Sequence, residues 1–311
     1  MMKRPMNVFL DTDIGPDCDD TAALSILLQL CKEGQANLLG VTHCTGSPYG
    51  LGTIDAICRL FGVQVPLGTC KNADFLSTGA ALCYTPAVCD KFAHGYPPDT
   101  CQPDAVDAFV QAMEGMEEDS VTMVTIGPLN NLARFLTDER ASTLMHKCVS
   151  RIVMMAGSFD FKTLGFPDDF VEWNVEMDVP AMRTAAALWN KEIILCPCEA
   201  AVLVCSGQPL ERYPDNPVKT AYTLFNQRIQ ETGITRPSWD LVTVACAVLD
   251  DRGPYTLSEP GNLTVSEKGV TAFEPDAAGK RRLIRLTGTN EEAVHWLNEM
   301  LERALCTMTH A

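Results

Sequence analysis

The chain of 311 residues has few positive charges and few histidines. It contains 24 lysines and arginines against 40 aspartates and glutamates, with five histidines. The formal net charge of −16 argues against a surface that binds nucleic acid or an anionic membrane. No uninterrupted apolar run is long enough to span a bilayer, and residues 1–5 contain no signal-peptide apolar region. We therefore expect a cytoplasmic protein.

The fourteen cysteines follow neither a disulfide pattern nor a zinc pattern. Most lie singly in apolar runs of a long chain, and Cys196-Pro-Cys198 lacks the two-residue gap of a zinc knuckle. A looser group falls in one loop region: Cys70, Cys83, Cys89 and Cys101. We expect reduced, mostly structural thiols rather than a zinc site in that loop.

Five aspartates fall within residues 11–20, directly after the apolar run 8–10 and before an apolar helical pattern that starts near Thr21. This order predicts a strand, a loop and a helix, the junction at which open α/β sheets bind ligands. Carboxylates this close repel one another unless some take up protons or a cation neutralises them. The candidate ligands are oxygens with no histidine nearby, which favours Ca²⁺ or Mg²⁺ over zinc.

Strand and helix patterns alternate along the rest of the chain. The predicted strands include residues 37–42, 65–68, 121–126, 151–157 and 192–195, and the predicted helices include 53–61, 105–113, 217–231 and 241–248. We predict one α/β domain over residues 1–311: an open, mainly parallel sheet flanked by helices. A small β and helical C-terminal extension follows, with strands at 263–265 and 283–286 and a helix at 289–305. Residues 70–102 read as a long loop, which predicts a functional lid or a disordered insertion.

The acidic stretch resembles a known family signature. Residues 11–15 (Asp-Thr-Asp-Ile-Gly), followed by Asp19-Asp20 and an alanine- and leucine-rich helix, resemble the N-terminal signature of the inosine-uridine preferring nucleoside hydrolase family. Those enzymes cut the N-glycosidic bond of ribonucleosides with a bound Ca²⁺. The family's shorter form has the Asp-Asp pair two residues nearer, so residues 16–18 contain an insertion and the role of Asp17 is open.

Three later motifs resemble the same family in the same order. Residues 127–131 (Gly-Pro-Leu-Asn-Asn) match a turn after a strand, and residues 172–174 (Glu-Trp-Asn), followed by Asp178 and Pro180, match a second motif. Asp240 matches the C-terminal calcium-binding aspartate. The resemblance thus extends over most of the first 250 residues and implies a nucleoside-hydrolase-like fold.

The resemblance implies a metal shell and a base. Asp13 would be the general base and a metal ligand. Asp20, Asp240 and the backbone carbonyl of Ile126 would complete the protein ligands of Ca²⁺.

The resemblance also implies ribose contacts. Asp19 would bind the 2′-hydroxyl, Asn174 the 3′-hydroxyl and Glu172 the 5′-hydroxyl. Ser47 stands where the family has an asparagine, so its contact with the ribose is either lost or bridged by water. Asp11, at the strand end, would orient the turn.

Trp239 departs from the family pattern. The residue before the last aspartate is usually a histidine that protonates the leaving base. An indole donates one hydrogen bond but cannot transfer a proton, so we expect Trp239 to stack on the base. Help for the leaving group would then come from the long loop, which offers His94 and Tyr96.

These inferences predict Ca²⁺-dependent hydrolysis of a ribonucleoside to ribose and a free base, in a homodimer or homotetramer. The sequence does not choose between purine and pyrimidine substrates. A haloacid-dehalogenase-like phosphatase also begins with strand-Asp-x-Asp, but its later Gly-Asp-x-x-x-Asp pair is absent. Ser47 and Trp239 keep open a third alternative, a pseudoenzyme that binds Ca²⁺ and ribose without turnover.

Overall fold

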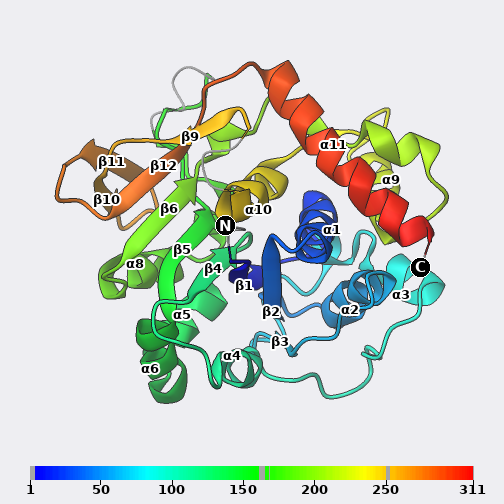
Figure 1. The fold of residues 1–311 in the computed structure, drawn as a ribbon, viewed down its shortest axis with the longest axis horizontal. Helices are drawn as coiled ribbons and strands as arrows, with labels where there is room; N and C mark the ends of the chain where they lie inside the picture. Colours follow the sequence, from blue (N-terminus) through cyan, green and yellow to red (C-terminus); the bar gives the residue numbers. More distant parts are fainter. Residues whose placement is uncertain (1–3, 161–164, 168, 250–252, 311) are drawn as a thin grey trace.

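A ten-stranded sheet runs through the part of the chain that the computed structural model describes, residues 4–160, 165–167, 169–249 and 253–310 (Figure 1). The strand order is β11-β10-β12-β6-β5-β4-β1-β2-β3, and β9 pairs with β12. The strands are β1 (Met6–Thr12), β2 (Ala36–His43), β3 (Leu67–Thr69), β4 (Val121–Thr125), β5 (Val149–Met155), β6 (Glu192–Cys196), β9 (Tyr255–Leu257), β10 (Gly261–Val265), β11 (Thr271–Pro275) and β12 (Arg281–Leu286).

Neighbouring strands from β3 to β12 pair in parallel, whereas β9, β10 and β11 pair antiparallel. The strand β1 lies between β2 and β4. The chain therefore leaves β1 toward one side of the sheet and later returns to its other side. In open α/β sheets the crevice at such a switch point is where ligands bind, so the acidic loop after β1 is well placed.

Alternate side chains of the strands pack into two cores on opposite faces. In β1, Val8 and Leu10 join one core and Phe9 joins the other. The first core is covered by α1 (Asp19–Lys32), α2 (Gly50–Leu60), α9 (Pro217–Arg228), α10 (Trp239–Leu249) and α11 (Asn290–Thr309). The second is covered by α4 (Ala105–Met113), α5 (Asn130–Thr137), α6 (Glu139–Cys148) and α8 (Val179–Leu188). The predicted α/β class and mainly parallel sheet are confirmed.

The predicted C-terminal strands extend the main sheet, because β12 pairs in parallel with β6. One part of the prediction needs correction: the sequence analysis names no helix between the strands at 151–157 and 192–195, but this segment contains α7 (Trp173–Met177) and α8. Side-chain caps define both helices: Glu172 accepts hydrogen bonds at the start of α7 and Asp178 at the start of α8.

The predicted long loop 70–102 contains a 3₁₀ turn, η1 (Gly79–Leu82), and the helix α3 (Thr85–Lys91). It packs against the acidic loop: the Tyr84 hydroxyl donates a 2.7 Å hydrogen bond to the Asp17 carbonyl. A side chain on Gly15 would collide with the Ala81 carbonyl at 2.7 Å, so the two loops approach backbone to backbone. Within the described residues, no helix is both long and apolar enough to cross a membrane.

Candidate functional site

A cavity of about 400 Å³ lies at the carboxyl end of β1. Its acidic wall consists of Asp13, Asp17, Asp19, Asp20, Glu172 and Asp240. Its aromatic wall consists of Phe170, Trp173, Phe225 and Trp239. Carboxylates and aromatic faces thus share one space, which joins elements from both ends of the chain.

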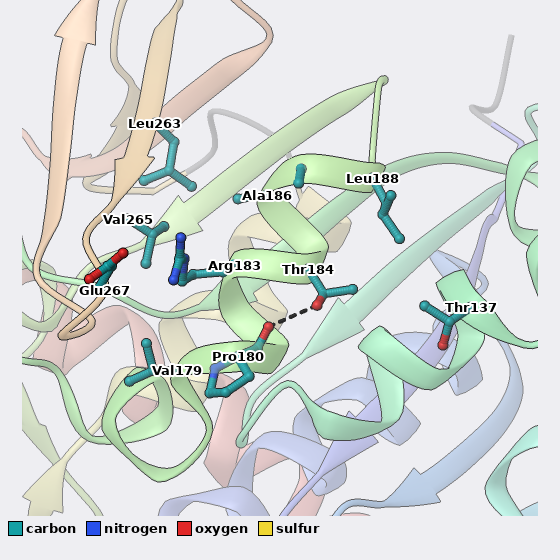
Figure 2. A pocket seen from close by; sticks show the side chains of 11 residues that line it. Thr137, Val179, Pro180, Arg183, Thr184, Ala186, Leu188, Leu263, Val265 and Glu267 are labelled. Carbon is teal, nitrogen blue, oxygen red and sulfur yellow. Dashed lines mark hydrogen bonds between the residues drawn. The ribbon is translucent and has the colours of Figure 1, made fainter.

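A second hollow, of about 840 Å³, lies beside α8 and β10 (Figure 2). Its charged side chains are Arg183 and Glu267, and the other residues of its wall are apolar residues and threonines such as Val179, Leu263 and Thr184. It contains neither a cluster of carboxylates nor an aromatic wall. The candidate site is therefore the smaller cavity.

Three aspartates from two helices converge in this cavity. Asp19 and Asp20 lie in the first turn of α1, and Asp240 lies in the first turn of α10. One carboxylate oxygen from each lies within 4.8 Å of the others, and all three side chains are buried. The positive ends of both helix dipoles favour acidic groups at these positions. The apolar faces of α1 and α10 pack in the same core, and this packing brings residues 220 positions apart together.

Burial raises the pKa values of four acids well above the ordinary value: Asp13, Asp19, Asp20 and Asp240. The negative charges of neighbouring acids raise each pKa further. In Asp19, for example, the charges of Asp17 and Asp20 add to desolvation. A divalent cation would relieve both effects, and an all-oxygen donor set is the kind that Ca²⁺ takes. The residues present therefore fit a calcium ion.

The spatial grouping differs in part from the ligand set implied by the family resemblance. Asp19, expected on the ribose, belongs to the group of three close carboxylates, whereas Asp13 lies beside it with its carboxyl group in hydrogen-bonding contact with Asp20. Ile126 lines the same cavity, and its backbone N–H donates a 2.9 Å bond to the Asp11 carbonyl. All of the predicted metal residues therefore face one cavity.

Local hydrogen bonds hold these acids in place. The Thr12 hydroxyl donates to Asp20, and the Asp240 backbone N–H donates to Asp19 Oδ2 at 3.1 Å. Gly127 leaves room for Asp13, because a Cβ atom at that position would lie 2.8 Å from Asp13 Oδ1. The Gly-Pro turn thus gives space to the predicted base.

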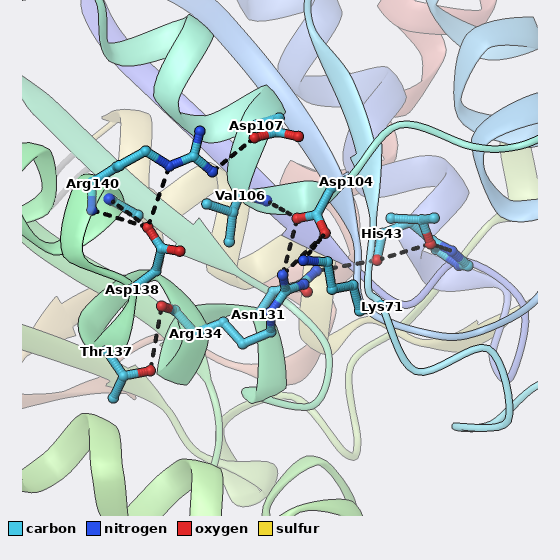
Figure 3. Close-up of polar contacts among 12 residues, drawn as sticks. His43, Lys71, Asp104, Val106, Asp107, Asn131, Arg134, Thr137, Asp138 and Arg140 are labelled. Carbon is cyan, nitrogen blue, oxygen red and sulfur yellow. Dashed lines mark hydrogen bonds and ion pairs between the residues drawn. The ribbon is translucent and has the colours of Figure 1, made fainter.

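Asp11 lies behind the cavity and not in its wall. Its Oδ1 accepts bonds from Thr42 Oγ1 at 2.5 Å and Asn131 Nδ2 at 2.9 Å. The Asn131 amide also donates to the His43 carbonyl at 3.1 Å, so β1, β2 and α5 are tied together (Figure 3). Burial outweighs these bonds and raises the pKa of Asp11 to about 7. On the outer side, Arg134 of α5 pairs with Asp104 before α4 at 3.0 Å (Figure 3).

Glu172 and Asn174 project into the cavity from the start of α7. The Glu172 carboxylate accepts backbone N–H bonds from Asn174 at 2.8 Å and Gly157 at 3.1 Å, and burial raises its pKa to about 7. Asn174 Nδ2 donates to the Met155 carbonyl at 3.1 Å. Because Nδ2 of Asn174 is bound to Met155, the side-chain oxygen of Asn174 remains as a hydrogen-bond acceptor in the cavity wall.

Trp239 presents an aromatic face to the cavity. Its indole N–H donates a 2.9 Å hydrogen bond to the backbone carbonyl of Cys198. The polar end of the indole is therefore bound to the protein, and what remains for a ligand is the ring. This arrangement suits stacking on a planar group.

The sequence analysis missed an ion pair in the wall of the same cavity. Arg236 Nε lies 2.9 Å from Asp17 Oδ1, and Arg236 Nη2 lies 2.6 Å from Asp17 Oδ2. The guanidinium carbon lies 4.8 Å from the centre of the Phe225 ring and 5.5 Å from that of Trp239. The insertion at residues 16–18 was the sequence feature that pointed to Asp17. Its partner Arg236 lies 219 residues away, so no local pattern predicts the pair.

Three predicted residues lie outside the cavity wall. The Ser47 hydroxyl accepts a 3.4 Å bond from the Tyr49 backbone N–H. His94 Nδ1 accepts a 3.3 Å bond from the Tyr96 backbone N–H, and its ring packs near Gly52 of α2. The structure thus brings the acids, Glu172, Asn174 and Trp239 together but not Ser47, His94 or Tyr96. A catalytic role for His94 stays a prediction.

Two solved structures resemble this fold. The inosine-uridine preferring nucleoside hydrolase from Bacillus anthracis is 17% identical, with a TM-score of 0.70 over 96% of this chain and 99% of that one. A structure titled inosine-guanosine nucleoside hydrolase is 16% identical, with a TM-score of 0.72 over 96% of this chain and 98% of that one. At such low identity these matches establish the fold.

A sequence relative and a family model match as well. An uncharacterised protein from Schizosaccharomyces pombe is 28% identical over 185 residues, which are 57% of this chain and 56% of that protein, so the match spans just over half of the relative. The family model described as inosine-uridine preferring nucleoside hydrolase matches residues 8–294, which include every acid of the cavity. The chain therefore belongs to the inosine-uridine preferring nucleoside hydrolase family.

Proposed function

We propose that this protein hydrolyses the N-glycosidic bond of a ribonucleoside and releases ribose and a free base. One observation carries the proposal: the buried acids and the aromatic wall share a cavity of about 400 Å³. That volume is within the range of small-molecule sites. A ribose at the acidic wall would place its base against the aromatic wall.

Asp19, Asp20 and Asp240, with the carbonyl of Ile126, are the residues that would hold Ca²⁺. When bound, the ion would supply charge that orients water and ribose hydroxyls and lowers the pKa of water. It would also allow these carboxylates to remain ionised in a buried site.

The side chains of the cavity have distinct roles in the proposed reaction. Asp13 takes the proton from the water that attacks C1′ as the C–N bond breaks and its electron pair moves to the base. The sugar becomes oxocarbenium-like, and nearby carboxylates stabilise its positive charge. Asn174 and Glu172 bind the 3′- and 5′-hydroxyls, and Trp239 holds the base by stacking.

Turnover of a substrate panel tests the proposal. The panel contains inosine, guanosine, adenosine, uridine and a nitrophenyl riboside, each with Ca²⁺ and with a chelator. We expect hydrolysis of at least the activated riboside with Ca²⁺ and its loss with the chelator. No hydrolysis of any member by calcium-loaded protein would exclude the hydrolase.

The geometry of Trp239 also favours a second candidate, a ribose-binding pseudoenzyme. An indole whose N–H is bound to Cys198 offers no proton to a leaving base. Calorimetric binding of nucleosides without turnover would support this candidate. The family match leaves the phosphatase alternative without support. A homodimer or homotetramer stays a prediction, which light scattering after gel filtration would test.

A further inference from the structure

Arg236 combines three features that the proposed reaction does not use. It lines the cavity, its side chain is 22% exposed, and its guanidinium lies over the rings of Phe225 and Trp239. It also comes from β8 (Arg236–Pro237), which Ser238 alone separates from the start of α10. The segment that supplies Asp240 to the acidic wall and Trp239 to the aromatic wall therefore supplies this cation as well.

The ion pair with Asp17 uses only one edge of the guanidinium. Nε lies 2.9 and 3.1 Å from the two oxygens of Asp17, and Nη2 lies 2.6 Å from Oδ2. Asp17 accepts these bonds, and its Oδ1 also accepts the Cys18 backbone N–H at 2.7 Å. Asp17 therefore occupies the edge of the guanidinium that Nε and Nη2 form.

The opposite edge keeps two donors. A guanidinium has five N–H bonds, and a side-on pair through Nε and Nη2 leaves one N–H on Nη2 and both on Nη1. Among the described residues, none accepts a hydrogen bond from Nη1. Two parallel N–H groups are thus available on a side chain that Asp17 holds in one orientation.

We propose that Arg236 is a specificity-determining residue that selects 6-oxopurine ribonucleosides through the O6 and N7 atoms of the base. This inference rests on the proposed function. Two parallel N–H donors match the adjacent O6 and N7 acceptors of guanine, and hypoxanthine presents the same pair. Adenine presents an amino donor in place of O6, which would face another donor. Uracil offers no such adjacent pair of ring-nitrogen and carbonyl acceptors.

The same contact assists departure of the base. As the C1′–N9 bond breaks, its electron pair moves into the purine, and negative charge spreads to N7 and O6. A fixed guanidinium stabilises that charge without transferring a proton, and the proton of the released base comes from water. Arg236 would thus stabilise the negative charge of the leaving base, for which Trp239 provides only a stacking face.

The test compares bases in the wild-type protein and in three variants. For the wild type we expect kcat/KM for inosine and guanosine to exceed that for adenosine by roughly 10- to 100-fold, the discrimination typical of one bidentate arginine contact. Arg236→Gln should reduce this ratio to near one. Arg212→Gln, which removes an arginine paired with Glu302 on α11 away from the cavity, is the matched control and should keep the ratio.

Loss of folding is separated from loss of recognition by a second variant. The double change Asp17→Asn with Arg236→Gln leaves no unpaired charge, and it should fold with a melting temperature close to the wild-type value while lacking the preference. Calorimetric titration with free hypoxanthine and free adenine adds a readout that needs no turnover. Tighter binding of hypoxanthine, abolished by Arg236→Gln, supports the inference.

The possible failures are distinguishable. Hydrolysis of the nitrophenyl riboside with equal kcat/KM for inosine and adenosine would overturn the role of Arg236 and leave the hydrolase proposal intact. If Arg236→Gln keeps the wild-type ratio of kcat/KM for inosine over adenosine, the role of Arg236 is overturned as well. If nothing is hydrolysed, the proposed function fails, and equal affinity for hypoxanthine and adenine would then overturn the role of Arg236 as well.

Discussion

The indole N–H of Trp239 donates a 2.9 Å hydrogen bond to the Cys198 carbonyl, so the side chain that replaces a histidine in the family pattern is anchored by its only donor. The bond directs the ring, rather than a polar atom, toward the cavity. In the proposed reaction, the rate therefore depends on how well the base leaves without a proton from this position.

Trp239 should act through its aromatic face. We expect the activated riboside to be hydrolysed much faster than inosine, and Trp239→His to narrow that gap. Trp239→Ala should raise KM by about tenfold by removing a stacking face worth ~1–3 kcal/mol, whereas Trp239→Phe should raise it less. Steady-state kinetics and melting temperatures are measured together. A large loss of stability with unchanged base discrimination would show that Trp239 only packs beneath Asp240.

Calcium should stabilise the folded protein. Only the folded state brings Asp19, Asp20 and Asp240 together, so about 100-fold excess of free Ca²⁺ over its Kd should add about 2.7 kcal/mol. The check is thermal unfolding in Ca²⁺ and in a chelator, with elemental analysis of the purified protein. Asp240→Asn should remove most of the response, and Asp215→Asn, at an exposed ion pair with Lys91, should keep it. A wild type that neither contains nor responds to a divalent ion would exclude the metal site.

Asp13 should be needed for rate more than for binding. Asp13→Asn should lower kcat by roughly 10²–10⁴-fold with a smaller change in KM, because a general base acts in the transition state. Circular dichroism checks that the fold is kept. Near-normal turnover would place the base elsewhere, with Asp17 as the first alternative.

Gly127→Ala should reproduce part of that loss without changing an ionisable group. The new Cβ would lie 2.8 Å from Asp13 Oδ1 and 2.7 Å from Cys44 Sγ, so Asp13 must move. We expect kcat to fall by at least tenfold, since small misplacements of a reacting group are costly. Gly95→Ala is the control, because the nearest atom there is the end of the flexible Arg59 side chain. Full activity of Gly127→Ala would contradict the placement of Asp13.

His43 should make the metal-free protein less stable in acid. Burial lowers its pKa from 6.5 to about 4, so in mild acid the unfolded chain binds a proton at His43 that the folded chain does not bind. Stability from this group is present above pH 6.5 and is lost as the pH falls toward 4. The expected loss is about 3 kcal/mol at the acidic limit.

Urea unfolding in a chelator at several pH values measures this effect. Other buried acids titrate in the same range, so the relevant quantity is the difference between the wild type and His43→Gln. That difference should shrink as the pH falls from 7 to 4. A parallel curve for His43→Gln would contradict the prediction.

The sequence alone determined the features that local order controls. Asp11 lies at the end of β1, Asp13 and Asp17 lie in the loop that follows, and Asp19 and Asp20 begin α1, so this local order places the acids at the carboxyl end of β1. The alternation of strands and helices likewise predicted a parallel sheet. Asp240 was identified through its resemblance to the family's C-terminal aspartate, and it lies in the first turn of α10.

Only the tertiary structure decided the contacts between distant segments. It brought the Asp240 backbone N–H within hydrogen-bonding distance of Asp19 and paired Asp17 with Arg236 across 219 residues. It also bound the indole N–H of Trp239 to a backbone carbonyl. It also left His94 outside the cavity. These contacts depend on the packing of α1 against α10 and of the long loop against the acidic loop, and no periodicity within one segment specifies which charges such packing will bring within hydrogen-bonding distance.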